Sequence, residues 1–193
     1  MSSGDRQREP CLRITIGGIE LRQFATEDTE DLYRVRNHES VRSYMADPRP
    51  IPWESHVEWV NRNLIPGRDI LLFLVRVKGE PIGLTLLKRL APDVVEVGAM
   101  FREARLHPVI PAQAAVAMLH LAFEHFRMRR AVAYVLPGHQ RAFDLNRALA
   151  GREAESDKPG MVCFRSSRAA LLRNPHYCRL MARIGPKMTI VTE

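Results

Sequence analysis

The chain has 193 residues, of which 46% are hydrophobic, so it is long enough for one compact domain with a single core. No stretch approaches the roughly 18–20 consecutive apolar residues of a membrane-spanning helix, which predicts no membrane partner. The formal net charge of +7 favours anionic partners such as a phosphate-rich cofactor or a nucleotide-linked substrate. The basic residues are scattered, and charge alone is too weak a signal to indicate nucleic acid.

Residues 1–10 are polar and lack the apolar core of a secretory signal, so we expect a disordered lead there. The chain has three cysteines without metal-type spacing, which predicts reduced thiols and a cytoplasmic location. We also expect no metal, because the histidines lie in no metal-binding pattern.

The first half of the chain predicts strands and helices in alternation. Apolar runs on both sides of Gly17-Gly18 indicate a β-hairpin over residues 11–24. A helix is expected over residues 26–45, with Thr26 as its N-cap and acidic residues in its first turn. Three prolines end it, and apolar residues at helical spacing predict a second helix over residues 53–65.

The second half continues the alternation. The patterns predict, in order, a hairpin over 69–90, a strand over 94–101, a helix over 112–126, a strand over 129–137, a helix over 138–151, a strand over 160–165 and a helix near 174–183. Strands interleaved with helices in this way predict a single α/β domain over residues 11–185, with a tail over 186–193.

Several stretches, taken in order, resemble the GNAT superfamily of acyl-CoA-dependent N-acyltransferases, in particular the branch that contains ribosomal-protein and nucleotide-sugar N-acetyltransferases. The likeness covers roughly residues 18–165. The stretches are "IELRQFATEDTEDLYRVRNHESVRSYM", "PWESHVEWV", "GEPIGLTLL", "VEVGAMF" and "LHLAFEHFRMRRAVAYVLPGHQRAFDLNRALA".

This resemblance implies a GNAT-like domain with a mixed, mostly antiparallel, twisted sheet flanked by helices. It also implies acetyl-CoA as co-substrate and direct acetyl transfer to the primary amine of a small molecule, an amino sugar or a protein N-terminus, with a small or nucleotide-linked amine as the expected partner. A homodimer is compatible with it.

The phosphate-binding signature of the family is missing. The signature is Gln or Arg, two residues, Gly, one residue, then Gly or Ala, and it falls on "LHPVIP", residues 106–111, where every expected position is changed. Pro108 and Pro111 each remove a backbone N–H that could hold a phosphate at the helix start. We therefore expect the phosphate site to be weakened or rebuilt. By resemblance it would use Val109, Ile110, Pro111, Ala112 and Gln113, with Arg102, Arg105 and His107 as further donors.

The resemblance also assigns roles in catalysis. Glu96 takes the position of the base, in an apolar strand that would favour proton uptake by a carboxyl. Tyr134 is the candidate acid, although an aromatic residue in a strand is more often part of the core. The remaining contacts with the cofactor would come from Val97, Gly98, Ala99, Met100 and Asn146.

By resemblance the acceptor would lie near Arg36, Asn37 and His56, although each of them taken alone is more typical of an ordinary surface residue. Because the signature loop is changed, a second hypothesis stays open. The chain could instead be a catalytically silent domain on the same scaffold that binds a partner or regulates one.

Overall fold

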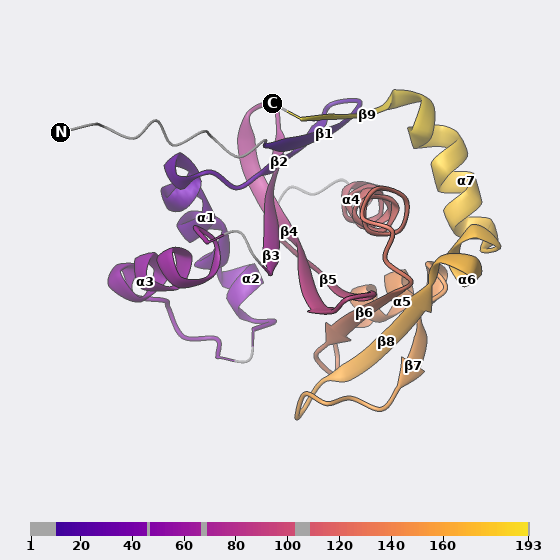
Figure 1. Cartoon of the computed structure of the whole chain (residues 1–193). Coiled ribbons are helices and arrows are strands. Elements are labelled where there is room, and N and C mark those ends of the chain that lie inside the picture. The colour runs from indigo at the N-terminus through magenta and orange to yellow at the C-terminus, as the bar shows by residue number, and fades with distance from the viewer. Residues whose placement is uncertain (1–10, 46, 67–68, 103–108, 193) are drawn as a thin grey trace.

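The computed structural model describes residues 11–45, 47–66, 69–102 and 109–192. The expected lead over 1–10 and residues 103–108, which include Arg105, His107 and Pro108, lie outside this part of the chain. The described residues form one α/β domain around a nine-stranded sheet of order β7-β8-β6-β5-β4-β3-β2-β1-β9 (Figure 1).

Neighbouring strands of the sheet are antiparallel, except that β5 and β6 are parallel. The mixed, mostly antiparallel sheet is therefore confirmed. The strands are β1 (Leu12–Ile16), β2 (Ile19–Gln23), β3 (Ile70–Val77), β4 (Glu80–Ala91), β5 (Val94–Phe101), β6 (Arg130–Val135), β7 (Arg152–Ala154), β8 (Val162–Ser167) and β9 (Met188–Thr192).

Seven α-helices accompany the described strands, and none of the helices in this part of the chain is long and apolar enough to cross a membrane. They are α1 (Thr29–Arg36), α2 (Glu39–Arg42), α3 (Trp53–Asn63), α4 (Val109–His120), α5 (Gln140–Ala148), α6 (Arg168–Leu172) and α7 (Pro175–Ile184). A π-helical turn, Leu121–His125, continues α4.

The helix expected over residues 26–45 is divided. Thr26 lies in a 3₁₀ turn before α1 rather than at an N-cap. A break follows α1, where His38 adopts an extended backbone and caps α2. The break is held by Asn37, whose amide accepts from the Ile51 N–H at 2.8 Å and donates to the Ile51 carbonyl at 2.9 Å.

The helices cover both faces of the sheet (Figure 1). On one face α1 and α3 bury Leu32, Val35 and Val60 against β3 and β4. On the other face lies α4, "VIPAQAAVAMLH", which carries no charge before His120. A helix that is apolar on all sides must be covered on all sides, which explains why α7 packs against the side of α4 away from the sheet.

The expected tail contains a strand. Residues 188–192 form β9 and pair with β1 from Leu12↔Thr192 to Ile16↔Met188. The segment "MTIVT" is rich in β-branched residues, which favour strands, but it is too short to predict one without knowledge of its partner.

One buried carboxylate joins α1 to the sheet. Asp28, at the start of α1, is 2% exposed, and it accepts hydrogen bonds from Arg22 of β2 at 2.5 Å and from Arg76 of β3 at 3.0 Å. Its second oxygen accepts from the backbone N–H of Ala25 at 3.0 Å. Two guanidinium groups and one backbone donor therefore compensate the burial of this charge.

We predict that Asp28→Asn lowers the free energy of unfolding by about 3 kcal/mol, because the partly buried Arg22 and Arg76 lose the buried anion that they share. Chemical denaturation measures this change. The matched control is Glu30→Gln, which breaks an exposed pair with Arg34 and should cost less than about 0.5 kcal/mol. Equal costs for the two variants would contradict a structural role for the buried network.

Candidate active site

Two neighbouring strands part in the middle of the sheet. β5 and β6 pair in parallel over three positions, from Val94↔Arg130 to Glu96↔Val132. Beyond that point β5 stays paired with β4 as far as Phe101, and β6 stays paired with β8 as far as Val135. The facing edges of the two strands thus leave backbone N–H and C=O groups directed into a wedge, where they need other partners.

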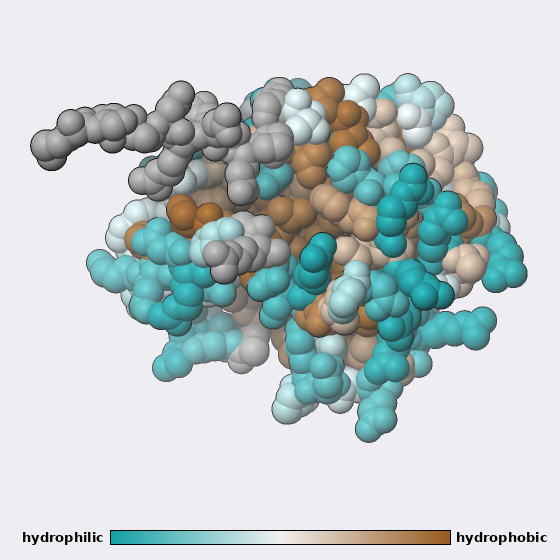
Figure 2. All heavy atoms as spheres, viewed as in Figure 1, coloured by the Kyte–Doolittle hydropathy of each residue, from teal (hydrophilic) through white to brown (hydrophobic). Residues whose placement is uncertain are grey.

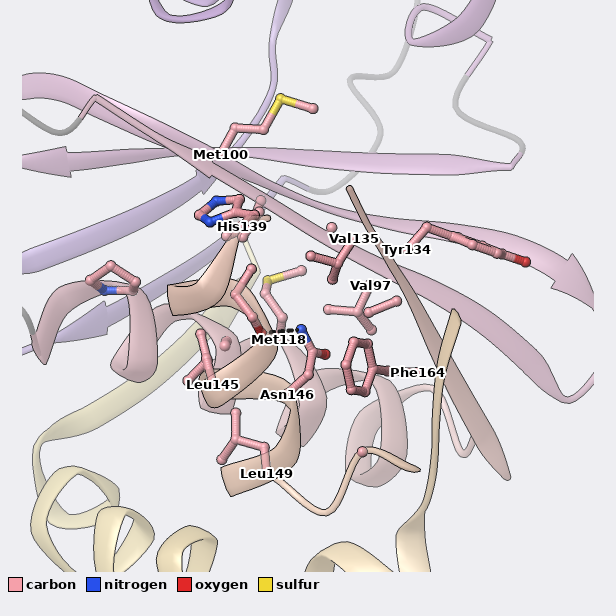
Figure 3. Close-up of a pocket in the computed structure, with 18 of the residues that line it drawn as sticks. Val97, Met100, Met118, Tyr134, Val135, His139, Leu145, Asn146, Leu149 and Phe164 are labelled. Atoms are coloured by element: carbon pink, nitrogen blue, oxygen red, sulfur yellow. Dashed lines mark hydrogen bonds between the residues drawn. The ribbon is translucent and has the colours of Figure 1, made fainter. Parts of the chain in front are cut away.

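The wedge opens into a cavity of about 730 Å³, within the range typical of small-molecule sites. The cavity lies between β5 and β6, against α4 and α5. Its wall is largely apolar, and Figure 3 shows Val97, Met118, Leu145 and Phe164 gathered around it. In the space-filling view hydrophilic side chains gather below the apolar middle of the molecule, over the region where Figure 1 places β7 and β8 (Figure 2).

Most residues that the resemblance assigned to the cofactor lie on this cavity. Those that line it are Val97, Gly98, Ala99, Met100, Pro111, Ala112 and Asn146. Among the described residues, Val109, Ile110 and Gln113 are not part of the wall. Val109 is 41% exposed, and Ile110 packs against the core.

The start of α4 stays compatible with an anion despite its proline. The helix begins at Val109, so Pro111 lies in its first turn, where backbone N–H groups have no partner within the helix. Pro111 removes one of these donors, while Val109, Ile110 and Ala112 retain theirs. The first turn of α4 therefore still contains backbone donors beside Pro111.

Glu96 lies on the cavity wall and is bound to an ammonium group. Its two oxygens accept hydrogen bonds of 2.8 and 2.9 Å from Nζ of Lys158. The Glu96 side chain is 15% exposed. Lys158 belongs to the connection between β7 and β8, and its Nζ lies 3.8 Å from the ring centre of Tyr134. Sequence patterns could not reveal Lys158, because it is far from Glu96 in the chain.

Tyr134 is placed less favourably for proton donation than expected. Its hydroxyl donates to Asp157 at 2.5 Å, and in Figure 3 its side chain points away from Asn146 and Val97. Burial, and then the hydrogen bond to Asp157, raise the pKa of Tyr134 well above its usual range. A phenol with a raised pKa gives up its proton less readily.

Asn146 lies on α5 with its amide nitrogen already engaged, because Nδ2 donates to the Ala142 carbonyl at 2.8 Å (Figure 3). A ring stack that the sequence did not predict lies nearby. Tyr44, which follows α2, stacks on His139, which precedes α5, with 3.8 Å between ring centres, and both line the cavity. Because α2 contacts β5 and α5 contacts β6, this stack spans the two sides of the wedge.

Arg36, Asn37 and His56 come together, but away from the cavity wall. His56 is fully buried, and its Nε2 lies 3.0 Å from the Thr29 carbonyl. Since a carbonyl can only accept, Nε2 carries the proton, and Nδ1 accepts from Arg36 at 3.2 Å. Arg36 in turn stacks on Trp59 at 4.1 Å. These contacts join α1 to α3.

Stability should depend on pH through His56. Burial lowers its pKa, and the charge of Arg36 lowers it further, although the Thr29 carbonyl opposes the shift. In the unfolded chain the ring takes up a proton near pH 6.5. Protonation therefore favours unfolding, and stability is lost as the pH falls below about 6.5.

We expect His56→Gln to show a smaller loss of unfolding free energy between pH 7 and pH 5 than the unchanged protein. Urea denaturation at the two pH values measures the difference. The exposed His176→Gln variant is the control and should keep the original pH dependence. If His56→Gln loses as much stability as the control, another group causes the effect.

These features define a class of protein: an α/β domain whose ligand site lies where neighbouring parallel strands separate. A family model described as an acetyltransferase (GNAT) domain matches residues 19–149. The chain therefore belongs to the GNAT acetyltransferase family, and the superfamily predicted from the sequence is confirmed.

Solved structures share the fold at low sequence identity. FdhC, a nucleotide-linked sugar GNAT, has a TM-score of 0.72 and 15% identity, over 89% of this chain and 97% of that one. Aminoglycoside acetyltransferase AAC(6')-Ib in complex with coenzyme A has a TM-score of 0.69 and 15% identity, over 80% and 98%. Spermidine N-acetyltransferase from Vibrio cholerae, with CoA and spermine, has a TM-score of 0.68 and 15% identity, over 81% and 99%. No curated protein matches the sequence.

Proposed function

We propose that the chain is an acetyl-CoA-dependent N-acetyltransferase that transfers the acetyl group directly to a primary amine. The observation that carries this proposal is the separation of β5 from β6 into an apolar cavity with a carboxylate, Glu96, at its closed end. The acceptor is a small or nucleotide-linked molecule with a primary amine. Similar folds that act on aminoglycosides, spermidine and nucleotide-linked sugars support this class of acceptor.

The cavity fits the pantetheine arm of the cofactor. Such an arm carries amide groups, and the free backbone edge over Val97–Met100 can pair with them as a neighbouring strand would. Asn146 lies on the opposite side of the cavity and offers a further amide. The apolar wall suits the methylene groups of the arm.

The phosphates would lie at the mouth of the cavity, near the first turn of α4. The N–H groups of Ile110 and Ala112 lie in that turn, and Gln113 lies there too. Arg141, in the first turn of α5, lines the cavity and can replace the donors that the prolines removed. An arginine can grip a phosphate with two parallel hydrogen bonds.

The acetyl transfer requires a neutral amine. In our proposal Glu96 binds the ammonium group of the acceptor and takes one proton, and the neutral nitrogen then attacks the thioester carbonyl. The C–S bond breaks, and the leaving thiolate of CoA takes up a second proton from the amine. Backbone N–H groups on the free edge of β5 polarise that carbonyl. Tyr134 contributes its ring face beside the ammonium, and its raised pKa keeps the hydroxyl protonated. Arg36, Asn37 and His56 support α1 and α3 from outside the acceptor site.

A binding experiment tests the cofactor assignment. At about 100 times its dissociation constant, acetyl-CoA should stabilise the folded chain by about 2.7 kcal/mol, measured as a rise in melting temperature. Arg141→Ala should weaken acetyl-CoA binding roughly 10- to 100-fold, because it removes a charged hydrogen bond worth about 1.5–3 kcal/mol. It should leave binding of S-acetylpantetheine, which has no phosphate, unchanged.

The matched control is Arg147→Ala on the same helix, where Arg147 pairs with Glu153. This variant should bind acetyl-CoA as the unchanged protein does. No stabilisation by millimolar acetyl-CoA would refute the transferase assignment.

A second test addresses the base. Turnover is measured from the release of the CoA thiol, with a panel of amines that includes spermidine, an aminoglycoside and an amino sugar nucleotide. Glu96→Gln should lower turnover by about 10²-fold or more at neutral pH, where the amine is protonated. The loss should shrink at high pH, where the amine is already neutral. Equal turnover at neutral pH would remove Glu96 from the mechanism.

Two observations favour a second candidate, a catalytically silent domain that binds or regulates a partner. Lys158 forms an ion pair with Glu96, the carboxylate that an acceptor amine would bind. Pro111 removes a backbone N–H donor at the proposed phosphate site. A silent domain predicts no stabilisation by acetyl-CoA and no thiol release with any amine of the panel. The same two experiments therefore decide between the two candidates.

A further inference from the structure

The cavity already contains a primary ammonium group, that of Lys158. The chain has 29 lysines and arginines, but only four lysines: Lys78, Lys88, Lys158 and Lys187. Arginine supplies the cation in other pairs of the domain, such as Arg22–Asp28 and Arg168–Glu124. In the pair with Glu96 the cation is instead a lysine.

This choice matters chemically. An arginine would form a stronger, two-pronged pair with Glu96, but it stays protonated under all physiological conditions. A lysine loses its proton more readily and then becomes a nucleophile. The residue at position 158 is thus suited to react, beyond forming an ion pair.

The surroundings of Nζ match what a primary amine requires. Glu96 binds it with both oxygens, at 2.8 and 2.9 Å, and the ring face of Tyr134 lies 3.8 Å away. Both partners come from strands β5 and β6, at the point where these begin to part. A carboxylate and an aromatic face together form a site for an ammonium group.

The connection that carries Lys158 is held by contacts of the two residues that precede it. Asp157 accepts a hydrogen bond from Tyr134 at 2.5 Å. The Ser156 hydroxyl accepts from the Lys158 N–H at 3.2 Å and donates to the Lys158 carbonyl at 3.0 Å. These contacts hold the backbone so that the side chain reaches the cavity.

We propose that Lys158 is an internal acceptor: its Nζ occupies the place of the acceptor amine and is itself acetylated. The inference rests on the proposed acetyl-CoA-dependent activity. Glu96 takes one proton from the ammonium, and the neutral nitrogen attacks the thioester carbonyl carbon. A C–N bond forms, the C–S bond breaks, and the second proton goes to the leaving thiolate. The products are N-acetyllysine, the free thiol of CoA and one proton released through Glu96.

Mass spectrometry tests this inference without knowledge of the natural acceptor. The full chain is incubated with millimolar acetyl-CoA that carries a deuterated acetyl group, and no amine is added. We expect one acetyl group per chain, at Lys158, at a rate at least tenfold above that of the exposed Lys78 and Lys187. Because the step is intramolecular, the rate per chain should not change when the protein is diluted tenfold.

Variants separate reaction at the site from chemical labelling of a reactive amine. Glu96→Gln should slow the labelling of Lys158 at least tenfold and leave that of Lys78 unchanged. Lys158→Arg keeps the cation but should abolish the single fast label, whereas Lys78→Arg should retain it. A denaturation curve for each variant verifies that it is folded.

Labelling of Lys158 at the same rate as Lys78, or at a rate per chain that falls with dilution, would overturn the inference. Stabilisation by acetyl-CoA in the same sample distinguishes failure of this inference from failure of the proposed function. Stabilisation without fast labelling of Lys158 overturns this inference alone. Neither stabilisation nor labelling overturns the proposed function as well.

Discussion

The separation of β5 from β6 after Glu96 and Val132 is the constraint on which the site depends. Each strand keeps its other neighbour, β4 or β8, so the two can diverge without leaving the sheet. The cost of unpaired backbone groups is tolerable because a ligand with its own amides can satisfy them. α4 closes the space from one face with apolar side chains such as Met118, so the cavity has a wall on that face.

Several arginines of the chain have partners inside the domain. Arg22 and Arg76 neutralise the buried Asp28, Arg36 braces His56, and Arg168 binds Glu124. Because each of these ion pairs cancels one positive and one negative charge, the net charge of +7 is not reduced by them. The chemically informative cation is Lys158, which faces the cavity.

Sequence patterns predicted those elements whose structure depends on residues close together in the chain. The hairpins, the apolar α4 and the strand that carries Glu96 follow from periodicity and turn residues, and the GNAT likeness placed Val97–Met100 on the cavity. Contacts between distant segments escaped prediction, including the pairing of Lys158 with Glu96 and the stacking of Tyr44 on His139. His56 shows the opposite case: its segment matched the family, but full burial between Thr29 and Arg36 directs its ring into the core.

The pairing of β9 with β1 brings the two ends of the described chain together, since Leu12 and Thr192 are direct partners. A short linker could therefore join them, while new ends are opened in the exposed turn at Lys78 and Gly79 between β3 and β4. Such a circularly permuted chain would keep every strand pair of the sheet. Any fused reporter would then be attached at the β3–β4 turn instead of at the β1–β9 edge.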